Sequence, residues 1–281
     1  LVGRTRERSR IWSALAEVDG SSAMQVVVLR GEAGLGKSRL ARWMARRATE
    51  VGATTLILEA NHDTHGGPAH GVGPMLARLF RCAGLEGEAR HARIAETLRT
   101  LGIDDPYDGT ALTEIVVGAS AGGLLDTPTR RHVVVERLLT ALADDRPLIL
   151  LVEDAQWARD TLELLRHLLG HRHRRTLPLL VLATLEDDAL EPGSVEASLL
   201  QALLGDDGCQ AIDVGPLGDD DHRELVQRLL RLDGGLADRV CRRTQGNPLF
   251  AVQLVGDWVR RGVLTVGETG FVLTRGERAE I

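Results

Sequence analysis

The chain has 281 residues, of which 43% are hydrophobic, enough for one large or two modest domains with a core of their own. Aromatic residues make up only 3%, so the core must be built from Leu, Val and Ala. The net charge of -6 gives no global attraction to nucleic acid, no apolar run approaches the roughly 20 residues of a membrane span, and no signal peptide is visible.

Three cysteines, Cys82, Cys209 and Cys241, have no CxxC spacing, and an odd count fits no closed disulfide framework. We expect buried thiols in a reducing cytoplasm. The chain starts with Leu1 and stops at Ile281 after a polar stretch, so we expect a fragment of a longer protein.

The first predicted element is a helix after residues 1–4, because apolar side chains from Ile11 to Val18 share one helical face. Thr5 is placed to cap this helix. A polar turn then leads into a hydrophobic strand, which we predict over residues 25–30.

This strand runs into residues 31–38, GEAGLGKS, which carry the full Walker A pattern between a strand and a helix. The glycines let the backbone take positive φ and bring its N–H groups against phosphate oxygens. Lys37 supplies a mobile charge for the β- and γ-phosphates, Ser38 offers a hydroxyl to Mg²⁺, and the helix beginning near Gly36 aims its positive end at the anion. A plain glycine turn would explain the glycines but not the Lys-Ser pair. The predicted phosphate-binding residues are Gly31, Glu32, Ala33, Gly34, Leu35, Gly36, Lys37, Ser38 and Arg39.

Helical spacing continues from Leu40 to Val51 with arginines on the solvent side, and a second strand is predicted over Thr54 to Ala60. The glycine-rich loop that follows holds several candidate metal ligands, namely His62, Asp63, His65 and His70. A metal site here is the weaker interpretation, because the loop lacks the helical spacing or cysteines that preorganise zinc.

Helices dominate the next segment, which we interpret as an insert at about 74–143 between the second and third strands. The spacing predicts one helix from Pro74 to about Leu101, a loop over Gly102 to Gly109, and two further helices at 112–125 and 131–143. Nothing in these residues indicates what the insert does.

A continuous apolar run, Leu148 to Val152, is typical of a strand buried on both faces, and it ends in Glu153-Asp154. Two adjacent carboxylates there are costly unless something positive faces them, and Mg²⁺ held by Ser38 and the phosphates would serve. This is the Walker B arrangement, in which one acid anchors the metal and the other orients or deprotonates the attacking water. By register Glu153 takes the metal side and Asp154 the water side, although a one-residue slip exchanges these roles. The predicted catalytic residues are Lys37, Glu153 and Asp154, and the predicted metal ligands are Ser38, Glu153 and Asp154.

A helix around Leu162 to Leu168 precedes a basic run, 171–175, which either contacts a phosphate or is a solvated loop at a helix end. The fourth strand is predicted over Leu179 to Leu185, and its Thr184 is placed to sense the γ-phosphate. The remaining elements of this unit are a helix at 195–204 and a short fifth strand at 211–214.

From Gly215 on, the pattern changes from alternating strands and helices to helices only, which indicates a small helical lid. Apolar stripes predict its helices at 222–232, 236–243 and 248–261, with Pro248 suited to the first turn of the third. After the lid, Val263 to Thr274 is typical of a hairpin. We therefore predict a nucleotide-binding domain at 1–214, the lid at 215–262 and the start of a truncated further domain at 263–281.

Four motifs carry a resemblance to a known family: LVGR at 1–4 followed by Glu7, GEAGLGKSRL at 31–40, LLVEDAQWA at 150–158, and GNPLF at 246–250. Together they resemble the STAND branch of AAA-related P-loop ATPases, the signal-transduction ATPases with numerous domains. The likeness is greatest to the ATPase modules of large bacterial LuxR-type regulators and adenylate-cyclase-linked proteins. It spans nearly the whole chain, and the joint order is more specific than any one motif.

The resemblance implies an α/β P-loop fold with a parallel five-stranded sheet in 5-1-4-3-2 order. It also implies that adenine lies near Val2, Gly3 and Arg4, that Pro248 closes over the base or ribose, and that ADP favours a closed state and ATP an open, oligomerised one. Related chains usually carry an arginine where this chain has Glu186, which removes an expected γ-phosphate sensor. They also tend to read Trp-Ala-Asp where this chain has Trp-Ala-Arg-Asp at 157–160.

The leading hypothesis is a cytoplasmic regulatory ATPase that binds ATP or ADP with Mg²⁺, hydrolyses ATP slowly and uses it to move the lid and self-associate. The alternatives are a DNA-handling ATPase of the origin-recognition type, against which the net charge argues weakly, and a non-hydrolysing nucleotide-binding scaffold, motivated by Glu186. Any DNA or effector binding is expected only through domains outside this chain, and no membrane contact is expected.

Overall fold

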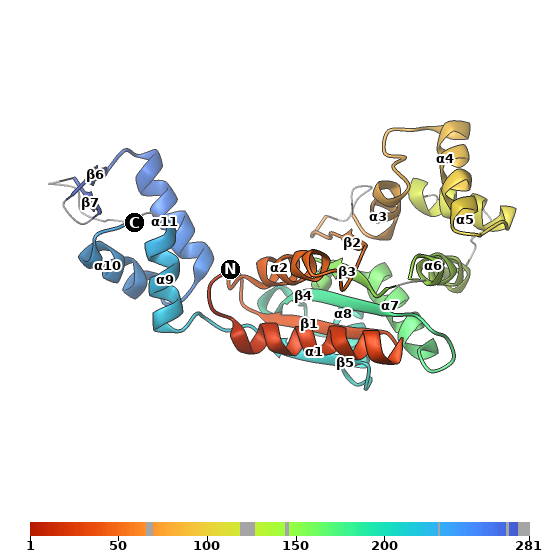
Figure 1. Ribbon diagram of the computed structural model, residues 1–281, viewed down its shortest axis with the longest axis horizontal. Coiled ribbons are helices and arrows are strands. Elements are labelled where there is room, and N and C mark those ends of the chain that lie inside the picture. The colour runs from red at the N-terminus through yellow and green to blue at the C-terminus, as the bar shows by residue number, and fades with distance from the viewer. Residues whose placement is uncertain (66–69, 119–126, 144–145, 230, 268–269, 275–281) are drawn as a thin grey trace.

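A computed structural model describes residues 1–65, 70–118, 127–143, 146–229, 231–267 and 270–274 (Figure 1). Its centre is a parallel five-stranded sheet in the order β2-β3-β4-β1-β5. The strands are β1 (Gln25–Gly31), β2 (Ile57–Ala60), β3 (Leu148–Val152), β4 (Leu179–Glu186) and β5 (Cys209–Asp213). Read from the opposite edge this is 5-1-4-3-2, so the predicted P-loop sheet is confirmed.

Parallel pairing brings the carboxyl ends of the strands to one edge of the sheet. Leu29 of β1 is in register with Thr184 of β4, and Val152 of β3 with Ala183 of β4. The loop after β1, the acids after β3 and the end of β4 therefore gather at the crevice where such sheets bind ligands.

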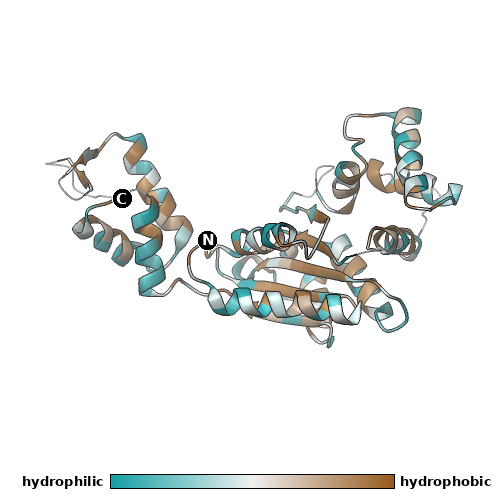
Figure 2. Cartoon of the chain, viewed as in Figure 1, coloured by the Kyte–Doolittle hydropathy of each residue, from teal (hydrophilic) through white to brown (hydrophobic). Residues whose placement is uncertain are grey.

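Alternation along the strands supplies two separate cores. Val26 and Val28 of β1 face one, and Val27 and Leu29 face the other. Helices α1 (Thr5–Ser21) and α2 (Lys37–Glu50) cover the second face, whereas α7 (Arg159–His171) and α8 (Val195–Leu204) cover the first. Figure 2 shows the strands as apolar ribbons between these helices, as expected for strands buried on both faces.

The insert between β2 and β3 contains α3 (Val72–Leu79), α4 (Gly87–Thr100), α5 (Pro106–Val117) and α6 (Pro128–Leu142). The single helix predicted from Pro74 to Leu101 was wrong, because the chain turns between α3 and α4 with Arg81 and Gly84 at positive φ. The predicted loop over 102–109 was also wrong at its C-terminal end, because α5 already begins at Pro106.

Asp105 is the reason that α5 begins early. Its carboxylate caps the helix by accepting a hydrogen bond from the Tyr107 N–H, and Pro106 occupies the first helical position. The helix ends at Gly118 in the left-handed conformation, and the rest of the helix predicted over 112–125 lies largely outside the described residues.

Three C-terminal helices, α9 (Asp219–Leu229), α10 (Gly234–Thr244) and α11 (Pro248–Arg260), pack around a core of their own. An antiparallel hairpin of β6 (Leu264–Val266) and β7 (Phe271–Leu273) joins this core, as predicted for the segment. Figure 1 shows the helices at one end of the sheet and the insert at the other. The proposed domain boundaries stay a prediction, and residues 275–281 of the proposed further domain lie outside the described part.

Other details also differ from the sequence-based expectations, among them β5, predicted at 211–214, and α9, predicted at 222–232. Thr5 is the first residue of α1, not its cap; Arg4 holds the cap position at a φ of 61° and no side chain bonds the helix end. The second strand begins at Ile57, later than predicted. None of the helices in the described ranges has the length and apolar character needed to cross a membrane.

Candidate functional site

The loop between β1 and α2 is shaped by three glycines at positive φ. Gly31, Gly34 and Gly36 have φ values of 145°, 79° and 90°. A Cβ at Gly31 would lie 2.5 Å from the carbonyl oxygen of Val214, so that position has no room for another residue. The local sequence therefore folds into a glycine-rich loop at the start of a helix, which is an anion-binding arrangement.

Lys37 is buried and folds back over this loop. Its Nζ donates hydrogen bonds to the carbonyl oxygens of Gly31 at 2.8 Å and Glu32 at 2.7 Å. Burial lowers the pKa of the Lys37 ammonium, and the charges of Glu186 and Asp154 oppose that shift. The ammonium group is therefore held at the loop with little solvent, where a phosphate would be a strong partner.

Thr184 of β4 connects the two predicted acids, which follow the end of β3. Its hydroxyl donates to Glu153 Oε2 at 3.1 Å and accepts from the Asp154 N–H at 3.0 Å. Glu153 is buried, whereas Asp154 is half-buried in the left-handed conformation at a φ of 58°. The two carboxylates thus have different surroundings, as a division of labour between them requires.

The second oxygen of Glu153 fits a bound cation. Glu153 Oε1 is buried and, within the described structure, accepts no hydrogen bond, although Arg42 Nη2 lies 3.3 Å away as an ion pair. A buried carboxylate oxygen without a donor is costly. Ser38, at the start of α2, and this oxygen are groups that would hold Mg²⁺ or its waters.

The N-terminal motif is tied to the same loop. Arg4 is buried, and its Nη2 donates to the carbonyl oxygen of Leu35 at 2.9 Å while Nη1 pairs with Glu7 at 3.1 Å. Gly3 lies against the carboxylate of Asp221 in α9. Val2 is half-buried beside them. The chain start thus bridges the phosphate loop and the C-terminal helices.

The C-terminal helices also contact the loop directly. Asn247 Nδ2 donates to the carbonyl oxygen of Ala33 at 3.1 Å, and the Leu249 N–H donates to that of Gly34 at 3.2 Å. A Cβ at Gly34 would lie 2.8 Å from Asn247 Oδ1. Pro248, between these two contacts, is the first residue of α11. The start of α11 therefore sits on the phosphate loop.

The structure brings most of the predicted site residues into one region. The charge of Asp154 acts on the Lys37 ammonium of the loop. The Thr184 hydroxyl joins Asp154 to Glu153, and α11 hydrogen-bonds to the loop. Arg39 and Glu32 are exposed at its rim.

Sequence reasoning missed Asn247 and Arg42. Asn247 has a local signal, because an Asn before Pro is a typical helix cap, but its loop contact has none. Arg42 was assigned to the solvent side; its side chain is 45% exposed but pairs with both Glu59 and Glu153.

His62 supports the acids from the side. Its Nδ1 donates to the carbonyl oxygen of Glu153 at 2.9 Å, since a carbonyl can only accept, and the Thr161 hydroxyl lies 2.9 Å from Nε2. Burial lowers the pKa of His62, which favours the neutral ring with its proton on Nδ1. Of the predicted metal loop, His70 pairs with Asp63 at 3.1 Å, and no metal-ligand group forms there among the described residues.

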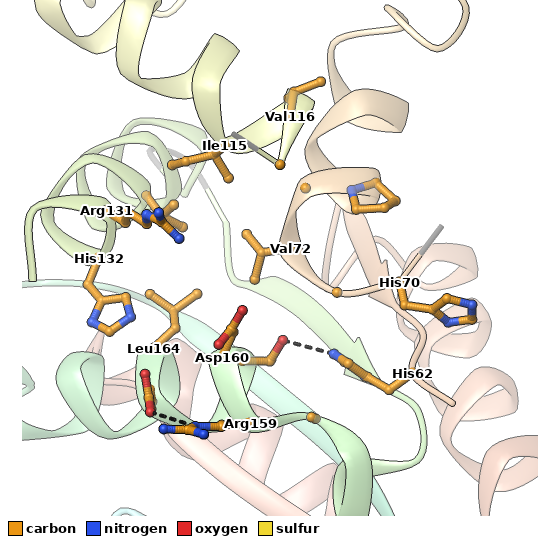
Figure 3. Close-up of a pocket in the computed structure, with 18 of the residues that line it drawn as sticks. His62, His70, Val72, Ile115, Val116, Arg131, His132, Arg159, Asp160 and Leu164 are labelled. Carbon is orange, nitrogen blue, oxygen red and sulfur yellow. Dashed lines mark hydrogen bonds and ion pairs between the residues drawn. The ribbon is translucent and has the colours of Figure 1, made fainter. Parts of the chain in front are cut away.

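A cavity of about 600 Å³ lies behind His62, between the insert and the start of α7 (Figure 3). His132 and Arg131 line it from α6, Val72 from α3 and Asp160 from α7. No residue of the phosphate loop lines this cavity, so within the described structure it is separate from the site above.

The model of one protein family, described as AAA ATPase domain, matches residues 1–182. Solved structures with similar folds include the Aeropyrum pernix ORC2 protein (ADPNP-ADP complexes), at 14% identity and a TM-score of 0.52, covering 93% of this chain and 65% of that chain. Drosophila ORC bound to DNA is similar at 15% identity and a TM-score of 0.51, covering 94% and 57%. A STAND protein with a tetratricopeptide repeat sensor from Pyrococcus horikoshii matches at 16% identity and a TM-score of 0.44, covering 88% and 28%.

At these identities the two likenesses with the higher scores concern the fold alone. The chain spans less than two thirds of the length of each of these three structures. Among curated proteins, no relative matches the sequence.

Proposed function

The chain belongs to the AAA ATPase domain family, and on that premise we propose that it is a regulatory nucleotide switch that binds ATP with Mg²⁺ and hydrolyses it slowly. One observation carries the proposal: the start of α11 hydrogen-bonds to the loop that holds Lys37. In this proposal, a group bound at the loop acts on α11 through these hydrogen bonds, which is what a switch requires.

Binding follows from the geometry of the loop. Its N–H groups and the positive end of α2 offer fixed partial charges to the phosphates. The Lys37 ammonium can exchange its two carbonyl partners for phosphate oxygens, which carry full charge and make stronger hydrogen bonds. Adenine binding near Val2, Gly3 and Arg4, and closure by Pro248, are part of the proposal.

Hydrolysis is assigned to the pair at the end of β3. When bound, Mg²⁺ would supply positive charge against the β- and γ-phosphates. Ser38 and Glu153 would hold the metal, and Asp154, in the more open position, would orient the attacking water or accept its proton. Thr184 fixes the relative position of the two acids through its hydroxyl.

Slow turnover is proposed because of Glu186. This residue ends β4, its N–H donates to Gln156 Oε1 at 3.1 Å, and its carboxylate is the largest acidic influence on Lys37. A carboxylate in this position adds negative charge where an arginine would stabilise the charge of the transferring phosphate. The switch is thus proposed to change state slowly. Self-association in its ATP form is a separate part of the proposal, which rests on the resemblance to STAND ATPases.

Lys37→Ala tests the binding step, and Arg46→Ala, which removes an exposed cation from the same helix, is its matched control. We expect Lys37→Ala to abolish ATP and ADP binding in equilibrium titrations, because Lys37 is the only lysine of the chain and no other side chain could supply its ammonium to the phosphates. Arg46→Ala should bind like the unmodified chain. Unchanged ATP affinity in Lys37→Ala would overturn the proposed site.

DNA handling is the second candidate, and the likeness in fold to Drosophila ORC bound to DNA is the observation that favours it. It predicts that this chain binds duplex DNA with an affinity that falls steeply with salt. Fluorescence titration with duplex DNA at two salt concentrations separates the candidates. A non-hydrolysing scaffold is distinguished instead by nucleotide that copurifies with the protein without release of phosphate.

A further inference from the structure

A second cluster of chemically active side chains lies on the far face of the sheet from α2, between α6 and α7. Glu136 of α6 is buried, and His167 and His171 lie one turn apart on α7. The ligand atoms of these three residues all lie within 4.8 Å of one another. It is the only such group within the described ranges, and the proposed nucleotide site does not use it.

The distances fit a shared cation. Glu136 Oε2 lies 2.9 Å from His167 Nε2 and 3.6 Å from His171 Nδ1. Two ligands at about 2.0–2.1 Å from a tetrahedral zinc ion are about 3.3 Å apart, between those two values. Histidines at i and i+4 of one helix, with a carboxylate from a facing helix, can therefore converge on one ion with small side-chain movements.

Ordinary ion pairing explains this cluster less completely. An Nε2–H of His167 can donate to one oxygen of Glu136, but His171 Nδ1 is buried and has no hydrogen-bond partner within the described structure. A buried ring nitrogen aimed at a carboxylate oxygen 3.6 Å away gains little from it. A metal ion between His171 Nδ1 and Glu136 Oε2 would be bound by both atoms.

The surroundings resemble the outer shell of a metal site. Arg175 Nε lies 3.4 Å from the other carboxylate oxygen, Oε1, which leaves Oε2 for the ion and orients the group. The ring of His132, one turn before Glu136, lies 5.3 Å from that of His167.

There is also an entry route. An open cavity of about 520 Å³ borders the cluster and is lined by His132, His167 and His171. Three protein ligands leave the fourth position of a tetrahedral site for water from this cavity or for His132.

We propose that Glu136, His167 and His171 form a binding site for a zinc-class divalent cation, which clamps α6 of the insert to α7. Imidazole nitrogen and carboxylate oxygen are both common ligands of zinc in proteins. Because α7 begins at Arg159, one short turn after the acids at the end of β3, the ion would fasten the insert to the ATPase core.

The test is zinc titration of the full chain, stripped by a chelator, in competition with a chromophoric chelator. Excess Mg²⁺ keeps the phosphate site out of the count. We expect one zinc ion per chain, and an affinity reduced by at least about tenfold in His167→Gln and in His171→Gln, because each removes a direct ligand. His91→Gln, an exposed histidine on α4, is the matched control and should bind normally.

A second measurement does not depend on the variants folding. X-ray absorption of the zinc-loaded, unmodified chain should show imidazole nitrogen and carboxylate oxygen around the ion. Sulfur in the first shell would assign the ion to a cysteine and overturn the proposal. So would no stoichiometric zinc uptake, or uptake that is unchanged in a His167→Gln/His171→Gln double variant.

Discussion

At the residue scale, hydrogen bonds fix the protonation of the buried His222. His222 in α9 lies near Thr244, whose hydroxyl donates to the Val240 carbonyl oxygen at 2.8 Å, so His222 Nε2 must donate to that hydroxyl at 3.0 Å. Its Nδ1 accepts the Gly246 N–H at 3.1 Å. A doubly protonated ring would lose this last bond. The neutral ring therefore positions Gly246, directly before the Asn247 that contacts the phosphate loop.

This arrangement predicts that the stability of the C-terminal helices depends on pH. Burial lowers the pKa of His222 below its usual 6.5, so the unfolded state binds more protons once the pH falls below that value. The contribution of His222 is fully present above pH 6.5 and is lost as the pH falls towards the lowered pKa. Urea unfolding from pH 8 to 5.5 should show this loss, and His222→Gln should reduce the slope. An equal slope in His222→Gln would contradict the assignment, as would an Nδ1–H form in ¹⁵N NMR spectra at pH 7.

The two acids at the end of β3 predict separable phenotypes. Glu153→Gln keeps the shape but removes the buried charge, so we expect weaker Mg²⁺ dependence of nucleotide binding along with loss of hydrolysis. Asp154→Asn should bind nucleotide and Mg²⁺ normally but lose hydrolysis by about 10²–10⁴-fold, the usual contribution of a general base. Phosphate release and Mg²⁺ titrations of both variants check this. Reversed phenotypes would exchange the proposed roles of the two residues.

At the scale of elements, the strands were the most predictable part of the fold. Apolar runs such as Leu148–Val152 are buried on both faces, so their composition alone marks them. Helix α8 was predicted with its bounds, because Ser194 caps it and Gly205 follows it. The turn between α3 and α4 was missed, since Arg81 adopts positive φ there and arginine carries no such preference.

The candidate site also has a part that the sequence predicts and a part that it does not. The phosphate loop is encoded locally, because its glycines, Lys37 and Ser38 are consecutive and follow a strand. The contact of Asn247 with Ala33 joins residues 214 positions apart, so no local pattern could reveal it. Motif order suggested that GNPLF belongs to the site, but only the fold shows which atoms meet.

Asn247 has two separable roles in α11, and these give an element-scale prediction. Its Oδ1 caps the helix by accepting the Phe250 N–H at 3.1 Å, and its Nδ2 contacts the loop. Asn247→Ala should destabilise the C-terminal helices by about 1 kcal/mol through the lost cap. Asn247→Asp keeps the cap but removes the donor to Ala33.

We therefore expect both Asn247 variants to release ADP faster, and only Asn247→Ala to lose stability. Urea unfolding and stopped-flow release of a fluorescent ADP analogue measure the two effects. Equal loss of stability in both variants would show that the loop contact, and not the cap, stabilises α11.

At the scale of the whole molecule, the sheet lies between two helical parts, and the phosphate loop is at the end nearer α9 to α11 (Figure 1). The connection to these helices runs through residues 214–218, where the Leu217 N–H donates to the Gly246 carbonyl oxygen at 2.9 Å. Gly246 fits closely against Leu217, since a Cβ there would lie 2.6 Å from its carbonyl oxygen. The connection is therefore packed against, and hydrogen-bonded to, the residue that precedes the cap of α11.

Nucleotide binding should consequently be felt across the C-terminal helices. ADP at the loop would hold Ala33 and Gly34 in place, and with them the Leu249 N–H that donates to Gly34. Hydrogen exchange measured by mass spectrometry should slow in residues 31–38 and 247–254 on adding ADP, while α4 in the distant insert stays unchanged. Lys37→Ala should remove both effects together. Protection of 31–38 alone, with α11 exchanging as before, would mean that the loop binds nucleotide without passing the signal to the helices, because the bonds of Asn247 and Leu249 would then be too weak to couple them.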